Sequence, residues 1–310
     1  MIKMSKWDYY CLKKIMGIFT RRVLHKPITK YANRNAMTAQ EGNTYIGEML
    51  SKGEPFVASR FGSTELSVIL RREAHKNHRF YKNNDANLCT LSGFFPNDEK
   101  LMDRFASEML NVVGEIDLLG TWYSSLEEYI VAEYMPQTKL THLVAMEPYS
   151  YADPWSKQLE HKKVLVVHPF EESIIRQYAR REKLYKNPDV LPQFELQTFK
   201  AVQTIAGQKD DRFETWFDAL EYMKQEIRKR DFDVAIIGCG AYGMPLAVEV
   251  KRMGKQAVHM GGATQILFGI KGARWDNNAS ISSRYNEYWV RPSESEQCIN
   301  SSAVENGCYW

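Results

Sequence analysis

The fold is decided by residues 232–262, which read FDVAIIGCGAYGMPLAVEVKRMGKQAVHMGG. The apolar run 233–237 predicts a short, buried parallel strand. Residues 238–243 follow at once and match the pattern G-x-G-x-x-G. The next apolar segment predicts a helix, because Pro245 suits a first turn. Residues 256–260 predict a second strand, so the stretch is a βαβ unit.

The glycine turn indicates a phosphate site. Gly238, Gly240 and Gly243 carry no Cβ, so their main chain can approach a phosphate closely at the start of a helix. A dinucleotide site also needs an acidic residue about 20 residues further on, but Val258 stands there and His259 follows. A phosphate or nucleotide-sugar site is therefore better supported than an NAD site. A tight crossing of strand and helix that needs glycine and binds nothing is the alternative.

The composition is that of an ordinary globular protein. The chain has 310 residues, of which 44% are hydrophobic and 25% are charged. Its five cysteines form no C-x-x-C pair, which fits reduced thiols in a cytoplasm. The apolar runs fall far below the ~20 residues of a membrane span, and the sequence predicts no signal peptide. We therefore expect a cytoplasmic protein.

The positive charge is concentrated at the start of the chain. Residues 1–30 carry eight Lys and Arg side chains against Asp8 alone, a net charge of +7 that leaves −4 for the rest. A slightly acidic body argues against a nucleic-acid partner. Apolar and aromatic residues alternate with the basic ones, which favours a helix on an anionic membrane surface, at the inner membrane face. An amphipathic helix packed on the body or on a partner protein explains the pattern equally well.

The remaining sequence alternates between strands and helices. Further strands are predicted at 55–60, 116–120, 143–146, 163–168 and 194–202, and helices at 45–52, 66–72, 98–113, 125–135, 171–185 and 213–230. This order predicts an α/β protein with a mostly parallel sheet flanked by helices, preceded by an N-terminal basic helical arm. We divide the chain into an arm and linker (1–44), one α/β domain (45–290, with 45–150 and 160–290 as candidate halves) and a polar tail (291–310). We expect the tail to be weakly ordered.

A second turn carries candidate chemistry. Residues 60–65 follow the first strand of the domain and read RFGSTE. Since α/β folds place ligands at the carboxyl ends of their strands, Arg60 and Glu65 flank an expected ligand site. The alternative is a structural arginine beside a helix that Ser63 or Thr64 caps.

These residues resemble a known family. The turn at 60–65 is similar to the Arg-Phe-Gly-Asp-x-Glu signature of the GT-D-type bacterial glycosyltransferases. Residues 259–272, HMGGATQILFGIKG, are similar to a segment of bacterial polysaccharide-biosynthesis proteins of that kind. The resemblance covers residues 45–280. It implies a Rossmann-like enzyme that moves a sugar from a nucleotide donor, often UDP-linked, to a growing surface polysaccharide or other glycan.

The resemblance also assigns candidate site residues. The family's Asp-x-Glu is associated with a divalent cation, Mn or Mg, and with the donor diphosphate. Its Glu corresponds to Glu65, but its Asp falls on Ser63, and a hydroxyl is a poor ligand for a hard cation. We therefore expect metal dependence to be weakened unless another residue completes the site. Arg60, Lys271 and Arg274 are candidates to stabilise the diphosphate instead.

An inverting transferase also needs a base for the acceptor hydroxyl. Glu65, Glu147, His168 and Asp276 qualify by residue type, and Trp122, Tyr149 and Trp275 could stack on a sugar or a base. Structural roles are the alternative for each. We assign catalysis to Arg60, Glu65 and Glu147, the metal to Glu65, and the nucleotide to Gly238, Gly240, Gly243, His259, Gly261, Gly262, Lys271 and Arg274.

Three functions follow from these residues. The first is a glycosyltransferase that acts on a glycan or lipid-linked glycan. The second is an NAD(P)-dependent oxidoreductase, which the missing acidic residue opposes. The third is a catalytically degenerate nucleotide-binding protein, suggested by Ser63. The first requires the turn at 60–65 and the glycine turn to lie at the same end of the sheet.

Overall fold

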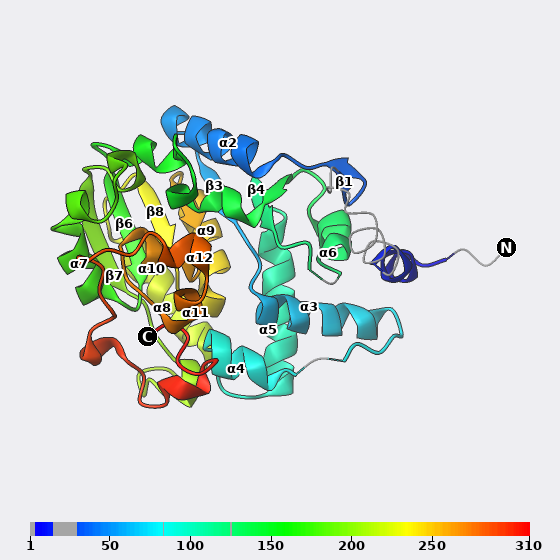
Figure 1. Cartoon of the computed structure of the whole chain (residues 1–310). Coiled ribbons are helices and arrows are strands. Elements are labelled where there is room, and N and C mark those ends of the chain that lie inside the picture. Colours follow the sequence, from blue (N-terminus) through cyan, green and yellow to red (C-terminus); the bar gives the residue numbers. More distant parts are fainter. Residues whose placement is uncertain (1–3, 15–29, 83, 125) are drawn as a thin grey trace.

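The computed structural model describes residues 4–14, 30–82, 84–124 and 126–310. Seven strands form one sheet in the order β5-β4-β3-β9-β8-β6-β7, and all of its pairings are parallel (Figure 1). The strands are β3 (Phe56–Ser59), β4 (Leu118–Thr121), β5 (Lys139–His142), β6 (Lys163–His168), β7 (Glu195–Lys200), β8 (Val234–Ile237) and β9 (Gln256–His259). The expected Rossmann-like α/β fold is confirmed.

Helices cover both faces of this sheet. The helices are α2 (Ala39–Lys52), α3 (Ser63–Lys76), α4 (Ala86–Ser92), α5 (Glu99–Val113), α6 (Glu127–Tyr134), α7 (Glu171–Tyr178), α8 (Trp216–Arg228), α9 (Gly243–Arg252), α10 (Ala263–Leu267), α11 (Ala273–Asp276) and α12 (Ala279–Ser282). A short antiparallel pair, β1 (Lys30–Tyr31) and β2 (Arg34–Asn35), precedes them. Each helix in the described part of the chain is too short or too polar to cross a bilayer.

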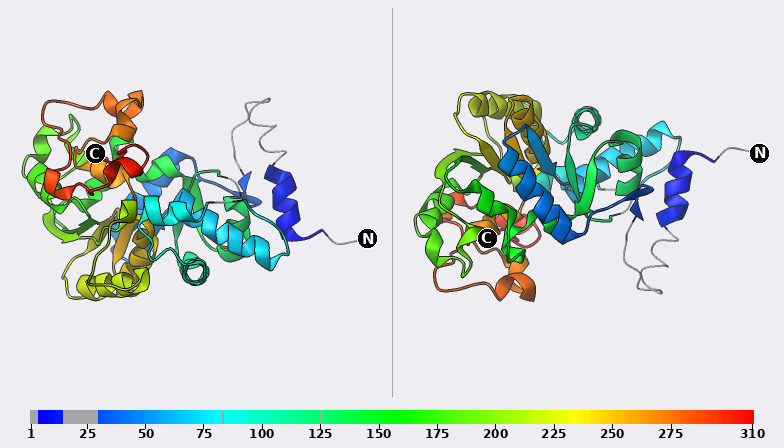
Figure 2. Two further views of the ribbon diagram at one scale, coloured as in Figure 1. Left: turned by 90° about the horizontal axis from the view of Figure 1, so that it is seen from below. Right: turned by 90° about the horizontal axis from the view of Figure 1, so that it is seen from above.

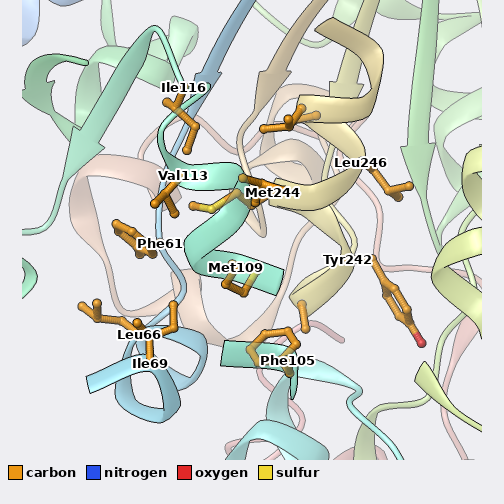
Figure 3. Packing of buried hydrophobic residues seen from close by; sticks show 14 of the residues in the cluster. Phe61, Leu66, Ile69, Phe105, Met109, Val113, Ile116, Tyr242, Met244 and Leu246 are labelled. Carbon is orange, nitrogen blue, oxygen red and sulfur yellow. The ribbon is translucent and has the colours of Figure 1, made fainter. Parts of the chain in front are cut away.

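The core has two layers, one on each face of the sheet. Successive strand residues alternate between them: Val57 belongs to one layer, and Phe56 and Ala58 belong to the other. The first layer packs α3, α5, α8 and α9, and Figure 3 shows Ile69, Met109 and neighbouring side chains meeting there. Each fully buried side chain of this size stabilises the folded state by roughly 1.5–3 kcal/mol relative to an exposed one. The strands and helices are therefore held firmly against one another, and this positions the loops that leave the strands.

The strand order brings the two candidate turns together. Strand β9 lies between β3 and β8, with Val258 level with Ala58 on one side and with Ile236 on the other. All three strands are parallel, so the turn after β3 and the glycine turn after β8 leave the same edge of the sheet. The geometry required for a shared site is therefore present.

The described part of the N-terminal arm packs on the body. Residues 6–14 are helical, and Trp7 and Tyr10 are buried with their rings 5.0 and 6.2 Å from that of Tyr129. Packing on the body, one of the two alternatives for the arm, thus holds for this segment. Residues 1–3 and 15–29 lie outside the described residues. Figure 2 shows the arm at one end of the molecule and the C-terminal segment at the other.

Several element boundaries were predicted wrongly. The strand expected at 143–146 is a 3-10 helix, because the strand ends at His142, whose ring accepts a hydrogen bond from the Val144 amide. Helix α2 begins at Ala39 rather than at 45. Residues 38–41, whose sequence T-A-Q-E also predicts a helix start, form a capping box between Thr38 and Glu41 there, so that second prediction is confirmed. Helix α7 ends at Tyr178 instead of 185, and α4 was not expected. Ser125, a predicted helix start, lies outside the described residues.

The expectation of a weakly ordered tail is wrong. Within residues 291–310, Val304, Cys308 and Trp310 are buried against the second core layer. The amides of Ala273 and Arg274 donate to the carbonyl groups of Trp310 and Cys308, both at 3.0 Å. A few apolar side chains in a polar segment are therefore enough to hold it, and they bring it to the ligand edge of the sheet.

Candidate active site

A cavity of about 460 Å³ opens at the carboxyl ends of the central strands. Most of the predicted site residues line it: Arg60, Glu65, Gly238, Gly240, His259, Gly261, Gly262 and Arg274. Gly243, Glu147 and Lys271 do not belong to its lining. The turn at 60–65 and the glycine turn thus line the same cavity.

Arg60 is held by a single carbonyl group. Its Nε donates to the Phe61 oxygen at 3.1 Å, and Trp122 Nε1 donates to the same oxygen at 2.7 Å. The guanidinium carbon lies 4.4 Å from the centroid of the Trp122 ring. Within the described chain the terminal amino groups of Arg60 have no hydrogen-bond or salt-bridge partner, and the side chain lines the cavity. They are therefore free to bind an anion. Gly261 has φ +62°, a backbone conformation that favours glycine, and a Cβ there would make only ordinary contact with Arg60 Nη1, at 3.4 Å.

Glu65 lies in the first turn of α3 and is 6% exposed. Its carboxylate folds back over Gly62, where a Cβ would stand 1.8 Å from Oε2. The Thr64 hydroxyl donates to that oxygen at 2.9 Å. The predicted cap by Ser63 or Thr64 is wrong: Gly62 takes the cap position, with no side-chain cap hydrogen bond. A side chain at position 62 would therefore displace the Glu65 carboxylate from this position.

The donor set does not fit a divalent cation. Two carboxylates line the cavity, Glu65 and Glu305, and Glu305 forms a salt bridge with Arg274. Ser63 supplies a hydroxyl where the family has a carboxylate. Among the described residues no group of three or more His, Cys, Asp or Glu side chains could hold a metal ion. Two guanidinium groups in the same wall make the cavity suited to an anion instead.

The C-terminal segment completes this wall. Arg274 is held by Glu305 and lies 4.8 Å from the centroid of the Tyr309 ring. Tyr309 also packs on Gly262, where a Cβ would lie 3.1 Å from its ring. Glu305 and Tyr309 were not predicted as site residues, because they lie far along the chain from Arg274 and from the two candidate turns. The aromatic pair at 309–310, which ends an otherwise polar tail, was the available signal.

Two histidines border the cavity in neutral form. Burial lowers the pKa of His168 to about 3, and burial together with Arg60 lowers the pKa of His259 to about 3. His168 Nδ1 accepts the Phe170 amide at 3.0 Å, so its proton is on Nε2. It can donate a hydrogen bond from that atom but cannot act there as a base. His259 Nδ1 is bonded to the Ser59 hydroxyl at 2.9 Å.

The three glycines of the G-x-G-x-x-G turn are needed for packing. A Cβ on Gly238 would lie 2.5 Å from the Gly261 oxygen, and one on Gly243 would lie 2.2 Å from His259 Nε2. Gly240 has φ +58°, and its Cβ would lie 2.6 Å from the Ser92 oxygen. The alternative interpretation, a tight crossing of strand and helix that needs glycine and binds nothing, therefore explains all three glycines. Gly238 and Gly240 line the cavity as well.

The remaining candidates lie outside the lining. Glu147 is largely buried behind Arg60, and burial raises its pKa to about 7, while the positive charge of Arg60 opposes this shift. Lys271 lies over the Tyr285 ring at 5.2 Å. Asp276 forms a salt bridge with Arg291, and Tyr149 is buried in the core.

A family model of known proteins matches most of the chain. The family model of the GT-D fold-like domain matches residues 37–267. Two solved structures of domain of unknown function 1792, one described as having a distinct glycosyltransferase fold, are 12% identical to the chain. They superpose with TM-scores of 0.42 and 0.43 over 75% and 74% of this chain and 79% of theirs. No curated protein matches. Because the family match spans most of the chain, the protein belongs to the GT-D fold-like domain family, as its resemblance to the GT-D-type glycosyltransferases predicted.

Proposed function

We propose that the protein transfers a sugar from a nucleotide-sugar donor, UDP-linked, to a glycan acceptor in surface polysaccharide synthesis. The observation that carries this proposal is the position of Arg60. Its free amino groups belong to the lining of a cavity that the glycine turn also lines. A donor diphosphate would take hydrogen bonds from Arg60 and Arg274, which bind phosphate oxygens in pairs.

In the proposed reaction, the bond between the anomeric carbon and the diphosphate oxygen breaks, and the acceptor oxygen forms the new bond to that carbon. The acceptor hydroxyl loses its proton to a base, and the nucleoside diphosphate leaves. Glu65 is our candidate base, because it is the carboxylate of the described lining that forms no salt bridge. Negative charge that develops on the leaving diphosphate is stabilised by the two arginines.

We propose that this transfer needs no divalent cation. The family signature implies a metal at the Asp-x-Glu positions, but Ser63 and the neighbouring guanidinium groups give an unsuitable donor set. Arg60 and Arg274 would supply the positive charge that a cation supplies elsewhere. Glu147, assigned to catalysis from the sequence, lies outside the cavity lining, and we propose instead that it positions Arg60, since the two charges interact.

The two other functions are less well supported. An NAD(P)-dependent oxidoreductase would use an acidic residue after the second strand of the βαβ unit, but β9 ends in His259. A catalytically degenerate protein would bind a nucleotide in the same cavity. Only a measurement of turnover distinguishes it from an enzyme.

Contact with a membrane surface through residues 1–30 is also proposed. In the described part of this arm Met4 and Leu12 are each about half exposed, and the segment carries the excess positive charge of the chain. Anionic lipid would attract it. Cosedimentation with phosphatidylglycerol vesicles at low and high salt, compared with phosphatidylcholine vesicles, tests this contact.

Nucleotide release tests the main proposal. Wild-type protein is incubated with UDP-glucose, UDP-galactose and UDP-N-acetylglucosamine in EDTA, and free UDP is measured. We expect release from at least one donor and a rise in melting temperature with UDP. Turnover that requires manganese would contradict the metal-free proposal. No release together with no thermal shift would contradict the function.

A further inference from the structure

A second cavity, of about 420 Å³, adjoins the first at the carboxyl ends of β6 and β7. Pro169, Val202 and Gln203 belong to the lining of both cavities. The common wall therefore consists of the residue that follows β6 and of the segment that follows β7. A ligand in either cavity contacts this wall.

The chemistry of the second cavity is that of a saccharide site. Its lining includes three glutamines and a tyrosine, Gln203, Gln208, Gln297 and Tyr222. An amide both donates and accepts, as each sugar hydroxyl does. The Tyr222 ring packs on Phe213, with centroids 5.1 Å apart, and on Arg212, at 5.3 Å, so it is a packed part of the wall. Pockets with a few convergent polar groups beside such a ring are typical of small-ligand sites.

One polar atom of a residue that lines the second cavity lacks a partner. Gln208 Oε1 is buried and accepts no hydrogen bond within the described chain. A buried acceptor without a donor costs roughly 1–3 kcal/mol. This oxygen is closed off from solvent, so a bound hydroxyl group would remove that cost after the Gln208 side chain turns toward the cavity. The arginines of this cavity are already engaged: Arg212 pairs with Asp210, and Arg230 lies 4.7 Å from the centroid of the Phe199 ring. Charged side chains that include Lys200 and Lys209 also line the cavity, so hydroxyl groups would bind here among both amides and charged groups.

We propose that the second cavity binds the saccharide acceptor, and that its hydroxyl reaches the donor sugar across Pro169, Val202 and Gln203. This inference rests on the proposed function. It places the donor diphosphate between Arg60 and the glycine turn and the acceptor beside Gln208 and Tyr222. During transfer the acceptor oxygen bonds to the anomeric carbon as the diphosphate leaves, and its proton passes to Glu65.

The test uses p-nitrophenyl glycosides of glucose, galactose and N-acetylglucosamine as probes, with the full chain and saturating UDP. Saturation-transfer NMR reports binding of each glycoside to wild type, Gln208→Ala, Gln297→Ala and Gln225→Ala. Gln225 is an exposed glutamine of α8 outside both linings and is the matched control. We expect at least one glycoside to bind wild type and the control, and the Gln208→Ala and Gln297→Ala signals to fall at least fivefold.

UDP binding, followed by melting temperature, separates the two proposals. If UDP shifts the melting temperature but no glycoside binds, or if Gln208→Ala and Gln297→Ala bind as wild type does, the acceptor site is wrong and the donor site stands. If UDP itself does not bind, the proposed function fails. If Arg60→Ala loses glycoside binding as completely as Gln208→Ala does in the absence of UDP, the probe occupies the first cavity and the inference is overturned.

Discussion

The guanidinium group of Arg60 lies 4.4 Å from the centroid of the Trp122 ring, and both side chains donate to the Phe61 carbonyl oxygen. These contacts engage the face of the guanidinium group and its Nε atom. They leave the terminal amino groups for a ligand in the cavity. Strand β4 thereby orients the arginine that β3 supplies.

Replacing Arg60 should remove most of the proposed activity. We expect Arg60→Ala to lower the rate of UDP release about 100-fold or more, because a donor aimed at the developing negative charge is worth about that much. Arg60→Lys should recover part of the rate, since it keeps the charge but not the paired donors. Steady-state measurement of UDP release checks both variants.

The matched control for Arg60 is Arg104→Ala. Arg104 also lies over an aromatic ring, with its guanidinium carbon 3.8 Å from the centroid of Phe217, but it is not part of the cavity lining. Arg104→Ala should lose a stacking interaction similar to the one that Arg60→Ala loses, with little effect on turnover. Equal rates for Arg60→Ala and wild type would contradict the assigned role.

Trp122 should act through Arg60. Trp122→Ala removes both the ring and the hydrogen bond to Phe61, and a cation–π contact contributes roughly 0.5–2 kcal/mol. We therefore expect kcat/KM for the donor to fall about 3- to 30-fold, and less in Trp122→Phe, which keeps a ring. In an Arg60→Ala background the substitution should have almost no further effect. Full additivity of the two substitutions would show that Trp122 acts independently.

Glu147 should make the stability of the protein depend on pH. Burial raises its pKa to about 7 from a usual value of 4.5, so the folded state binds more protons than the unfolded state between these pH values. Its contribution to stability is therefore present below about pH 4.5 and is lost as pH rises through 7, by at most about 1.4 kcal/mol per pH unit. Glu147→Gln should reduce the dependence of the free energy of unfolding on pH between about pH 4.5 and 7. Urea unfolding at pH 5, 6, 7 and 8 measures it, and an unchanged slope would contradict the assignment.

The central unit was predictable because its information is local. Residues 234–259 form strand, glycine turn, helix and strand within one continuous stretch, and alternating burial on the strands follows from their apolar runs. The turn at 60–65 could be paired with it because parallel strands share one ligand edge. Glu305 and Tyr309 could not be placed in this way, since only tertiary packing of Val304, Cys308 and Trp310 brings them to Arg274.

Glu305 should compete with the donor for Arg274. The salt bridge between them is partly exposed, with side-chain exposures of 37% and 50%, so its own contribution to stability is small. Glu305→Gln frees the guanidinium group, and we expect UDP affinity to rise two- to fivefold at low salt and less at high salt. Calorimetric titration measures this change.

Asp276→Asn is the matched control for Glu305→Gln, because the salt bridge of Asp276 with Arg291 lies outside the cavity lining. Weaker UDP binding in Glu305→Gln would show that Glu305 orients Arg274 instead.

Ser63 should decide whether the protein responds to metal. A hydroxyl next to Glu65 is a weak ligand for a hard cation, whereas a second carboxylate would provide the Asp-x-Glu pair of the family signature. We expect UDP binding by wild type to be the same in EDTA and in manganese. Ser63→Asp should bind UDP at least tenfold more tightly with manganese than with EDTA, and Ser63→Asn, similar in size but uncharged, should show no such difference. Calorimetric titration of all three proteins measures this. Loss of wild-type UDP binding in EDTA would mean that other residues complete a metal site. A manganese response in Ser63→Asn equal to that of Ser63→Asp would mean that charge at this position is not the determinant.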